Sequence, residues 1–478
     1  MLFNSIDFTI FLPIVFILYW FVFNKSIKNQ NVLIVLASYV FYGWWDWRFL
    51  TLILFSTVVD FTIGKLLYKE TKTTNRKALL WTSIIINIGL LGFFKYYNFF
   101  VENFTDAFTF FGGEITSNTL YIILPVGISF YTFQTLSYTI DIYRNKLKPT
   151  TNFVSFAAFV SFFPQLVAGP IERASNLLPQ FYKKRKFNSE NAILGVNQII
   201  WGLFKKIVIA DNCAQYANDI FSNYQEYSGT TLFLGAFYFA FQIYGDFSGY
   251  SDIAIGTARL FGFKLMTNFR YPYFSRDIAE FWRRWHISLT TWFRDYVYIP
   301  LGGSRGSLHK KIRNVFAIFL ISGFWHGANW TFIFWGGINA LFFIPLLIMK
   351  KNRVNTDTVA ENRFLPSLKE CLKMISTFLI VLFGWVFFRA DSITQAFLYI
   401  QRIFTADVLF IERLKISRFS FEIIPLIGIL LLFEWFSRNE EFPLVSKKNS
   451  FTKVSLVIIL IIMFGSFSSI QEFIYFQF

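Results

Sequence analysis

Long apolar runs recur along the whole chain, and they constrain its fold more than any other feature. A run of about 20 apolar residues can cross a membrane as an α-helix. Of the 478 residues 55% are hydrophobic and 15% charged, whereas ordinary globular domains carry about 25% charged residues. The mean hydropathy is +0.46. Such a chain cannot cover several water-exposed domains, so the sequence predicts an all-α integral membrane protein.

The apolar runs give a series of candidate membrane spans. They cover residues 7–23, 31–47, 49–68, 78–98, 119–140, 153–170, 192–210, 230–250, 312–325, 329–349, 372–389, 420–437 and 453–475. Proline and glycine interrupt some of them, as at Pro125–Gly127 and Pro164–Pro170. Irregular backbone at membrane depth is tolerated only where protein or a water-filled cavity surrounds it. We therefore expect about 10–11 transmembrane spans plus re-entrant and interfacial helices.

The distribution of charge predicts how the chain is organised and oriented. No repeat, matched pair of halves or long polar linker is found, so residues 1–478 are predicted to form a single polytopic membrane domain. Lysine and arginine gather in residues 65–77, 141–148 and 173–186, whereas 99–118 contains three acidic residues and no lysine or arginine. The positive-inside rule places the basic loops in the cytoplasm and the acidic loop outside. Counting spans then puts both termini outside. The first apolar run lacks a preceding basic region, which favours a membrane helix over a cleavable signal peptide.

Lysine and arginine exceed aspartate and glutamate by 45 to 29, a net charge of +16. Because the basic residues lie between apolar spans, we expect membrane lipids and an acidic or phosphate-bearing substrate as partners, and no nucleic acid. Residues 264–313 form a basic segment that also carries an apolar stripe at helical spacing. The stripe consists of Ile278, Phe281, Trp282, Trp285 and Leu289. The segment is predicted to be a cytoplasmic amphipathic helix in the interface plane.

Four arginines lie largely off this apolar stripe: Arg276, Arg283, Arg284 and Arg294. They either anchor the helix at the membrane surface or bind the phosphates of a donor from the cytosol.

The chain contains three histidines, His286, His309 and His326. His326 lies between two apolar runs, in Gly323–Gly327, where an ionisable side chain is costly unless it faces a cavity. A neutral imidazole suits general-base catalysis, and the flanking glycines would let a substrate approach. A buried, hydrogen-bonded histidine is the alternative for His326 and the favoured reading of His286. His309 lies in a basic loop and is expected to be solvated.

Other polar residues and motifs give weaker indications. Asp246 and Asp252 interrupt an apolar stretch and could form a general-acid or cation site, although a structural role is favoured. The two cysteines, Cys213 and Cys371, cannot form a disulfide framework or a cysteine-rich metal site, and no metal is expected. No nucleophile elbow, P-loop or dinucleotide fingerprint occurs, so serine hydrolysis and nucleotide-driven transport have no local support.

Several longer motifs, spread over essentially the whole chain, resemble the membrane-bound O-acyltransferase (MBOAT) superfamily. They are Tyr42–Phe49, Gln134–Arg144, Ala168–Ile171, Asp277–Leu289, Tyr296–Gly303, Gly323–Gly327 and Phe473–Phe478. The sequence is most similar to the alginate O-acetyltransferase (AlgI-like) branch and more distantly to teichoic-acid D-alanyl transfer proteins.

The resemblance implies a helical enzyme of the bacterial inner membrane. It would move an acyl group, acetyl being the first choice, from a cytosolic thioester to a hydroxyl of an exported polysaccharide. His326 would act as general base and His286 as a second residue of the site. The donor would be acetyl-CoA or an acyl-carrier thioester, bound as substrate, with no resident cofactor. The acceptor would be the polymer or an extracytoplasmic SGNH-type acyltransferase.

The oxyanion of such a reaction needs hydrogen-bond donors. Trp325 and Asn329, with backbone N–H groups near the glycines, are candidates, and Asp246 and Asp252 would also line the site. Three rival functions stay open at this point. One is D-alanyl-type transfer to a cell-wall polymer, another is a transporter or flippase without acyl chemistry, and the third is a scaffold of a secretion complex.

Overall fold

The computed structural model describes residues 1–110, 112, 119–167, 169–407, 410, 423–445, 450–467 and 473–474. Within these ranges the regular structure is helical and no strand occurs, which confirms the all-α fold class. Five helical stretches are long and apolar enough to cross a membrane: Ile27–Lys69, Thr73–Phe110, Ser189–Ser222, Trp330–Ile348 and Leu368–Arg389. Shorter apolar helices cover Ile6–Val22, Phe153–Leu166, Ile423–Phe436 and Phe451–Phe464.

The chain divides into two compact units. The first comprises Met1–Ala192 with Thr257–Met266, and the second comprises Ile193–Gly256 with Thr267–Phe478. The single domain over residues 1–478 stays a prediction.

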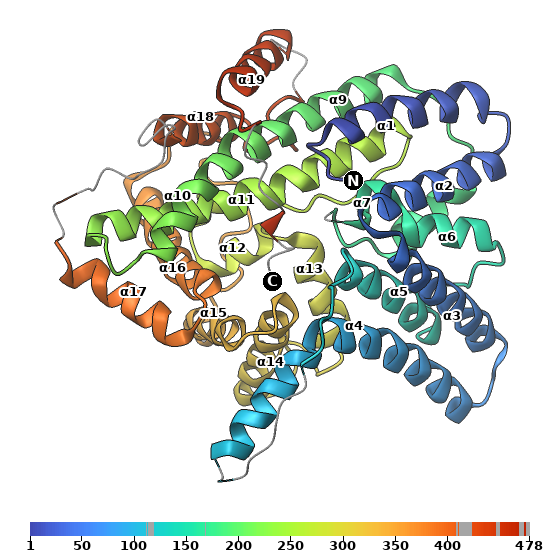
Figure 1. Cartoon of the computed structure of the whole chain (residues 1–478), viewed down its shortest axis with the longest axis horizontal. Helices are drawn as coiled ribbons and strands as arrows, with labels where there is room; N and C mark the ends of the chain where they lie inside the picture. The colour runs from blue at the N-terminus through green and yellow to red at the C-terminus, as the bar shows by residue number, and fades with distance from the viewer. Residues whose placement is uncertain are drawn as a thin grey trace. The chain divides into compact units, whose positions relative to one another are not determined.

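The first unit is built from a run of helices, and its α4 is a long uninterrupted helix (Figure 1). Its helices are α1 (Ile6–Ile17), η1 (Leu18–Val22), α2 (Ile27–Asp46), η2 (Trp47–Phe49), α3 (Leu50–Lys69), α4 (Thr73–Phe110), α5 (Ile128–Tyr143), α6 (Phe153–Ser161), α7 (Phe163–Leu166), α8 (Ala174–Leu177) and η3 (Leu178–Tyr182). Helix α4 runs past the predicted end of its span at residue 98, because no proline or glycine follows Gly92 until Gly112.

The predicted interruptions of the apolar runs are present in this unit. Helix α5 begins only after Gly127, whose φ of 75° lies in the left-handed region that favours glycine. Helices α6 and α7 are separated at Phe162. Buried side chains bond the backbone at this second break: Ser38 Oγ accepts the Phe163 N–H at 3.1 Å, and Gln134 Nε2 donates to the Phe159 carbonyl at 2.5 Å. Protein groups thus replace water around the irregular backbone.

The second unit begins within α9 and contains the candidate active site. Its helices are α9 (Ser189–Leu203), η4 (Phe204–Ala210), α10 (Asp211–Ser222), α11 (Gly229–Leu260, which enters the first unit at Thr257), η5 (Pro272–Phe274), α12 (Ile278–Arg284), α13 (Ile287–Phe293), η6 (Arg294–Tyr298), α14 (Leu308–His326), α15 (Trp330–Ile348), α16 (Leu368–Arg389), α17 (Ile393–Thr405), α18 (Ile423–Phe436) and α19 (Ser450–Phe464). Helices α14 and α15 pack side by side as a hairpin (Figure 1).

Glycines bring α14 and α15 into close contact. A Cβ atom at Gly323 would overlap the carbonyl oxygen of Phe332, one at Gly336 would overlap that of Phe319, and one at Gly327 would overlap the Phe332 ring. The expectation that Gly323 and Gly327 leave room for a substrate is therefore wrong, because α15 fills that space.

Some predicted features fall at the edge of the described chain. The spans 420–437 and 453–475 correspond to α18 and α19 where they are described. Residues 420–422, 468–472 and 475 lie outside the described residues, as do Ala168, most of Phe473–Phe478 and part of the loop 99–118.

Membrane orientation can be tested by labelling single cysteines. Asp106 is exposed on α4, and an Asp106→Cys variant should react with an impermeant maleimide in intact cells, because residues 99–118 lack lysine and arginine. Cys371 is partly exposed and is first replaced by serine, whereas Cys213 is buried. Lys184→Cys, in a basic loop, should react only after the cells are opened. The reverse pattern would invert the orientation.

Candidate active site

A cavity of about 500 Å³ lies in the second unit and brings His286 and His326 to a common space. Its wall is largely aromatic and aliphatic, with Trp282, Trp285, Leu289, Phe293, Ile318 and Phe319 among the lining residues. Its charged lining residues are Arg283, Arg294 and Arg353, and none of the described residues that line it is Asp or Glu. An apolar pocket with a few convergent polar groups is the usual form of a small-molecule site. The charge of this one favours an anionic ligand.

His286 occupies a strained backbone position between α12 and α13. Its φ of 43° and ψ of 54° are left-handed, a conformation that costs a residue other than glycine about 1–2 kcal/mol. The side chain is 2% exposed, and the rings of Phe247 and Phe269 have their centres 6.0 Å from the imidazole. Burial lowers the pKa of His286 to about 3, so the ring is neutral at physiological pH. Strain of this kind often accompanies a functional role.

The two ring nitrogens of His286 have different surroundings. Nδ1 lies 3.1 Å from Oδ1 of Asn268. Nε2 is buried and has no hydrogen-bond partner in the described part of the chain. No motif in the sequence marks Asn268, because its contact with His286 is created by the fold.

His326 is the last residue of α14 and is 6% exposed. Aromatic rings surround it edge-on: the centres of Trp325, Trp335 and Phe388 lie 5.0, 5.2 and 5.4 Å from the imidazole. These rings leave the imidazole little contact with solvent, and a hydrogen bond to a bound group is stronger in such a low-dielectric environment. The third histidine, His309, is exposed in the first turn of α14, consistent with the solvated position expected for it.

The basic segment is not the single amphipathic helix that its spacing predicted. The apolar stripe is divided between α12 and α13, because Trp285 is extended and His286 is left-handed. Of the five stripe residues, Trp282 is half-buried and the other four are buried: Ile278, Phe281, Trp285 and Leu289. His286, at this kink, lines the cavity.

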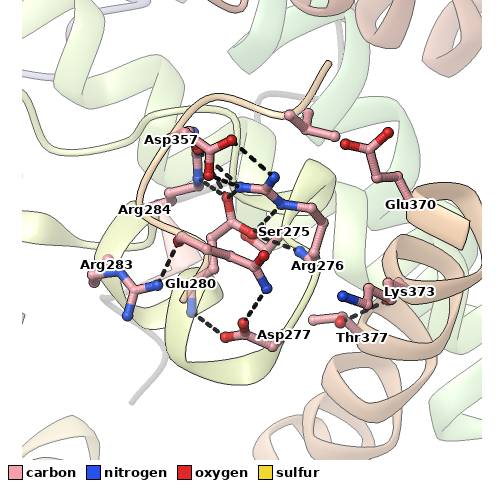
Figure 2. Close-up of polar contacts among 12 residues, drawn as sticks. Ser275, Arg276, Asp277, Glu280, Arg283, Arg284, Asp357, Glu370, Lys373 and Thr377 are labelled. Atoms are coloured by element: carbon pink, nitrogen blue, oxygen red, sulfur yellow. Dashed lines mark hydrogen bonds and ion pairs between the residues drawn. The ribbon is translucent and has the colours of Figure 1, made fainter. Parts of the chain in front are cut away.

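Arg276 and Arg284 belong to an ion-pair cluster around Glu280, which Figure 2 shows together with Asp357. Arg276 Nε bonds Glu280 Oε2 at 3.0 Å, and Arg284 bonds Glu280 Oε1 at 2.8 Å. Arg276 also pairs with Asp357 at 3.0 Å. This hydrogen bond lowers the pKa of Asp357. Burial disfavours the charge of Arg276, but hydrogen bonds to Glu280 and Asp357 raise its pKa.

Arg283 and Arg294 are placed differently from the other two arginines. Both are exposed and line the cavity. Arg283 donates to the carbonyl oxygens of Asn352 and Asn355 at 2.8 and 2.7 Å, and so fixes the segment that carries Arg353. Arg294 pairs with the neighbouring Asp295 at 2.8 Å. Arg353 was not predicted from the sequence, because it follows Lys350 and Lys351 in what reads as an ordinary basic loop.

The candidate oxyanion donors occupy different places, and neither is among the lining residues of the cavity. Asn329 caps α15: its Oδ1 accepts the Thr331 N–H at 2.9 Å, and its Nδ2 donates to the Asp391 carbonyl at 3.0 Å. Trp325 is 3% exposed and packs beside both histidines, with ring centres 6.4 Å from His286 and 5.0 Å from His326.

Asp246 and Asp252 form ion pairs with two lysines of the π-helical turn η4. Asp246 lies 2.7 Å from Lys206 and accepts the Ile474 N–H at 2.7 Å. Asp252 lies 2.5 Å from Lys205. Neither aspartate lines the cavity. These contacts agree with the structural role that the sequence favoured. Across the described ranges, no three His, Cys, Asp or Glu side chains come together as metal ligands would.

A helical membrane protein whose cavity joins two histidines to cationic side chains has the form of a polytopic membrane enzyme. A sequence profile of the membrane-bound O-acyltransferase family (MBOAT) matches residues 143–389. The chain is 41% identical over 398 residues to the probable alginate O-acetylase AlgI of Pseudomonas aeruginosa, covering 83% of this chain and 73% of that protein. The chain therefore belongs to the MBOAT family and is a multi-pass membrane acyltransferase.

Two further relatives carry other names. The peptidoglycan O-acetyltransferase of Helicobacter pylori is 37% identical over 415 residues, covering 81% of this chain and 76% of that protein. The teichoic acid D-alanyltransferase of Bacillus subtilis is 27% identical over 279 residues, covering 56% of this chain and 69% of that protein.

Proposed function

We propose that this protein transfers an acyl group, acetyl being the first choice, from a cytosolic thioester to a hydroxyl of an exported polysaccharide. The observation that carries the proposal is the cavity that His286 and His326 share with cationic residues and no carboxylate among its described lining. The names of the alginate and peptidoglycan relatives support a polysaccharide acceptor. The D-alanyltransferase relative makes a D-alanyl group the second candidate.

The proposed reaction is general-base acyl transfer. His326 takes the proton of the acceptor hydroxyl as its oxygen attacks the thioester carbonyl carbon. The tetrahedral oxyanion then collapses, the carbon–sulfur bond breaks, and the thiolate receives the proton from the imidazolium. An ester and a free thiol result, and His326 is again neutral. The aromatic wall around His326 keeps competing water away from the thioester.

The donor is expected to meet the arginines of the cavity. Coenzyme A and phosphopantetheine carriers bear phosphate groups, which arginine binds through charge-assisted hydrogen bonds. Arg283, Arg294 and Arg353 line the cavity, whereas Arg276 and Arg284 are already bonded to Glu280. We therefore assign donor binding to the cavity arginines and a structural role to the other two.

Removing a donor-binding arginine should raise the donor KM about tenfold with a smaller change in kcat, as the loss of a charge-assisted hydrogen bond does. We expect this for Arg294→Ala, and a larger rise for Arg283→Ala, which also releases the segment bonded at Asn352. Arg305→Ala, an exposed arginine that does not line the cavity, is the matched control and should keep the wild-type KM. If the Arg283, Arg294 and Arg353 variants all behave like the control, these arginines only anchor the segment.

The donor can be identified with purified protein. The protein is incubated with radiolabelled acetyl-CoA, an acetyl-carrier thioester or a D-alanyl-carrier thioester, and release of free thiol is followed. We expect one of these thioesters to be consumed in the presence of an acceptor polysaccharide. If no thioester is cleaved although labelled solute crosses the membrane, the transporter hypothesis replaces the acyltransferase hypothesis. The final acceptor, either the polymer or an extracytoplasmic SGNH-type partner, is identified by which of the two carries the new ester.

A further inference from the structure

The buried residue Asn268 binds the segment around His286 through both its backbone and its side chain. Its carbonyl oxygen accepts the Ile287 N–H at 2.8 Å, and its side-chain Oδ1 lies 3.1 Å from Nδ1 of His286. The same Oδ1 accepts the backbone N–H of Ser288 at 3.3 Å and the Ser288 hydroxyl at 2.8 Å. Asn268 is 2% exposed. The left-handed backbone of His286 is thus held by several bonds to a single residue.

These bonds fix the orientation of the Asn268 amide. A backbone N–H can only donate, so the amide atom that faces Ser288 must be the acceptor Oδ1. On its other side Nδ2 donates to the hydroxyl of Ser251 at 2.9 Å. Oδ1 therefore faces His286 as an acceptor. It follows that Nδ1 carries the hydrogen of the neutral imidazole and that Nε2 keeps its lone pair.

The lone pair of Nε2 is an unsatisfied hydrogen-bond acceptor within the described part of the chain. Nε2 is buried and receives no hydrogen bond there, although buried polar atoms are nearly always paired. The same imidazole lines the cavity that also contains His326. A hydroxyl bound in that cavity can supply the missing hydrogen bond.

We propose that Asn268 is a positioning residue that fixes the Nδ1–H tautomer of His286 and so presents Nε2 as a hydrogen-bond acceptor to a second hydroxyl of the acyl acceptor, next to the one that His326 deprotonates. The identity of that hydroxyl rests on the proposed function, whereas the tautomer does not. Partners of this kind commonly orient functional histidines through the ring nitrogen that does not react.

The charged groups near His286 favour its neutral form. The cavity contributes Arg283 from α12, Arg294 from η6, His326 from α14 and Arg353. On α11, Phe247 faces the imidazole. The nearby cations oppose protonation, and none of the described residues that line the cavity is a carboxylate that could favour it. We therefore expect Nε2 to stay unprotonated between about pH 5 and 8.

The tautomer can be observed directly, because the chain has only three histidines. In a His309→Gln/His326→Gln variant labelled with ¹⁵N-histidine, all signals of the imidazole come from His286. Solid-state NMR of this protein in lipid should show a pyrrole-type Nδ1 and a pyridine-type Nε2. Adding Asn268→Leu should abolish this pattern. A pyrrole-type Nε2 with Asn268 intact, or an unchanged pattern after Asn268→Leu, would overturn the proposal.

Activity provides the second readout. In the otherwise wild-type chain, Asn268→Leu should lower kcat at least tenfold and leave the donor KM unchanged. Ser288→Ala, which removes one hydroxyl but keeps the bond between Asn268 and His286, should stay within about threefold of wild type. A correctly folded Asn268→Leu protein with wild-type kcat would also overturn the proposal.

An Asn268→Asp variant distinguishes a positioning role from a packing role. It also provides a test if the Asn268→Leu variant does not fold. A carboxylate keeps the acceptor oxygen but stabilises the imidazolium, so it raises the pKa of His286. Activity should then fall as the pH decreases from 8 to 6, whereas the wild type shows no such loss from His286. An Asp variant with the wild-type pH profile would contradict the role. If the predicted tautomer is found but wild-type protein cleaves no thioester, the positioning stands and the proposed function fails.

Discussion

Replacing His326 by glutamine should lower acyl transfer by about 10²–10⁴-fold, the usual contribution of a general base. Glutamine has a similar volume and can still form a hydrogen bond, but it cannot accept the proton of the attacking hydroxyl. His326 is 6% exposed and lies beside the rings of Trp335 and Phe388, which a glutamine can also contact. We therefore expect normal expression and membrane insertion. O-acylation of the exported polymer, measured by ester release from intact cells, should be almost abolished.

The other two histidines are graded controls for this result. His309→Gln should leave acylation near wild type, because His309 is exposed in the first turn of α14. Acylation by the His286→Ala variant should lie between that of His326→Gln and that of His309→Gln, since the neutral His286 ring lines the same cavity. Normal acylation by a well-folded His326→Gln protein would remove the general-base assignment and reopen the transporter reading.

The largest loss of stability is expected at Glu280, which is 1% exposed and neutralises two arginines. Glu280→Gln keeps the shape but removes the charge, and leaves Arg276 without its buried counter-ion. Breaking a buried ion pair in this way typically costs about 3–5 kcal/mol. The variant should show a clearly lower thermal midpoint in detergent, or too little folded protein to measure, by fluorescence-detected size-exclusion chromatography.

Asp357→Asn is the matched control, because the Asp357 side chain in the same cluster is 56% exposed. Solvent screens its charge, so we expect a loss of at most about 1 kcal/mol. Equal midpoints for the Glu280 and Asp357 variants would show that burial does not govern this cluster. The structural role assigned to Arg276 would then be withdrawn.

Much of the fold could be predicted because hydropathy is a local property of the sequence. Long apolar runs mark helices such as α3, α15 and α16, and proline and glycine mark the interruptions before α5 and α7. Hydropathy alone misplaces the end of α4, because an acidic stretch without helix breakers has the composition of a loop. The role of a glycine is also ambiguous in the sequence. Gly323 allows the close contact with α15, but no local sequence feature distinguishes such a contact from space for a substrate.

The chemistry of the site depended on contacts that are distant in sequence. That His326 is an unusual residue follows from its position between apolar runs, but its proximity to His286 does not. The kink at His286 interrupts a stripe with good helical spacing, and it is held by Asn268, which belongs to an unremarkable loop. Likewise, Arg276 and Arg283 have different roles because of their partners in the fold. Arg276 pairs with Glu280, whereas Arg283 bonds the carbonyl of Asn352 and lines the cavity.

In the proposed reaction this chain cleaves a thioester on one side of the membrane and forms an ester on the other. Proteoliposomes of known orientation, with radiolabelled acetyl thioester at the cytoplasmic face and acceptor polysaccharide at the opposite face, test it most directly. We predict thiol release and labelled ester on the polysaccharide with wild-type protein, and neither above background with His326→Gln. Label that reaches the far side without thioester cleavage, or equal ester formation by both proteins, would contradict the account.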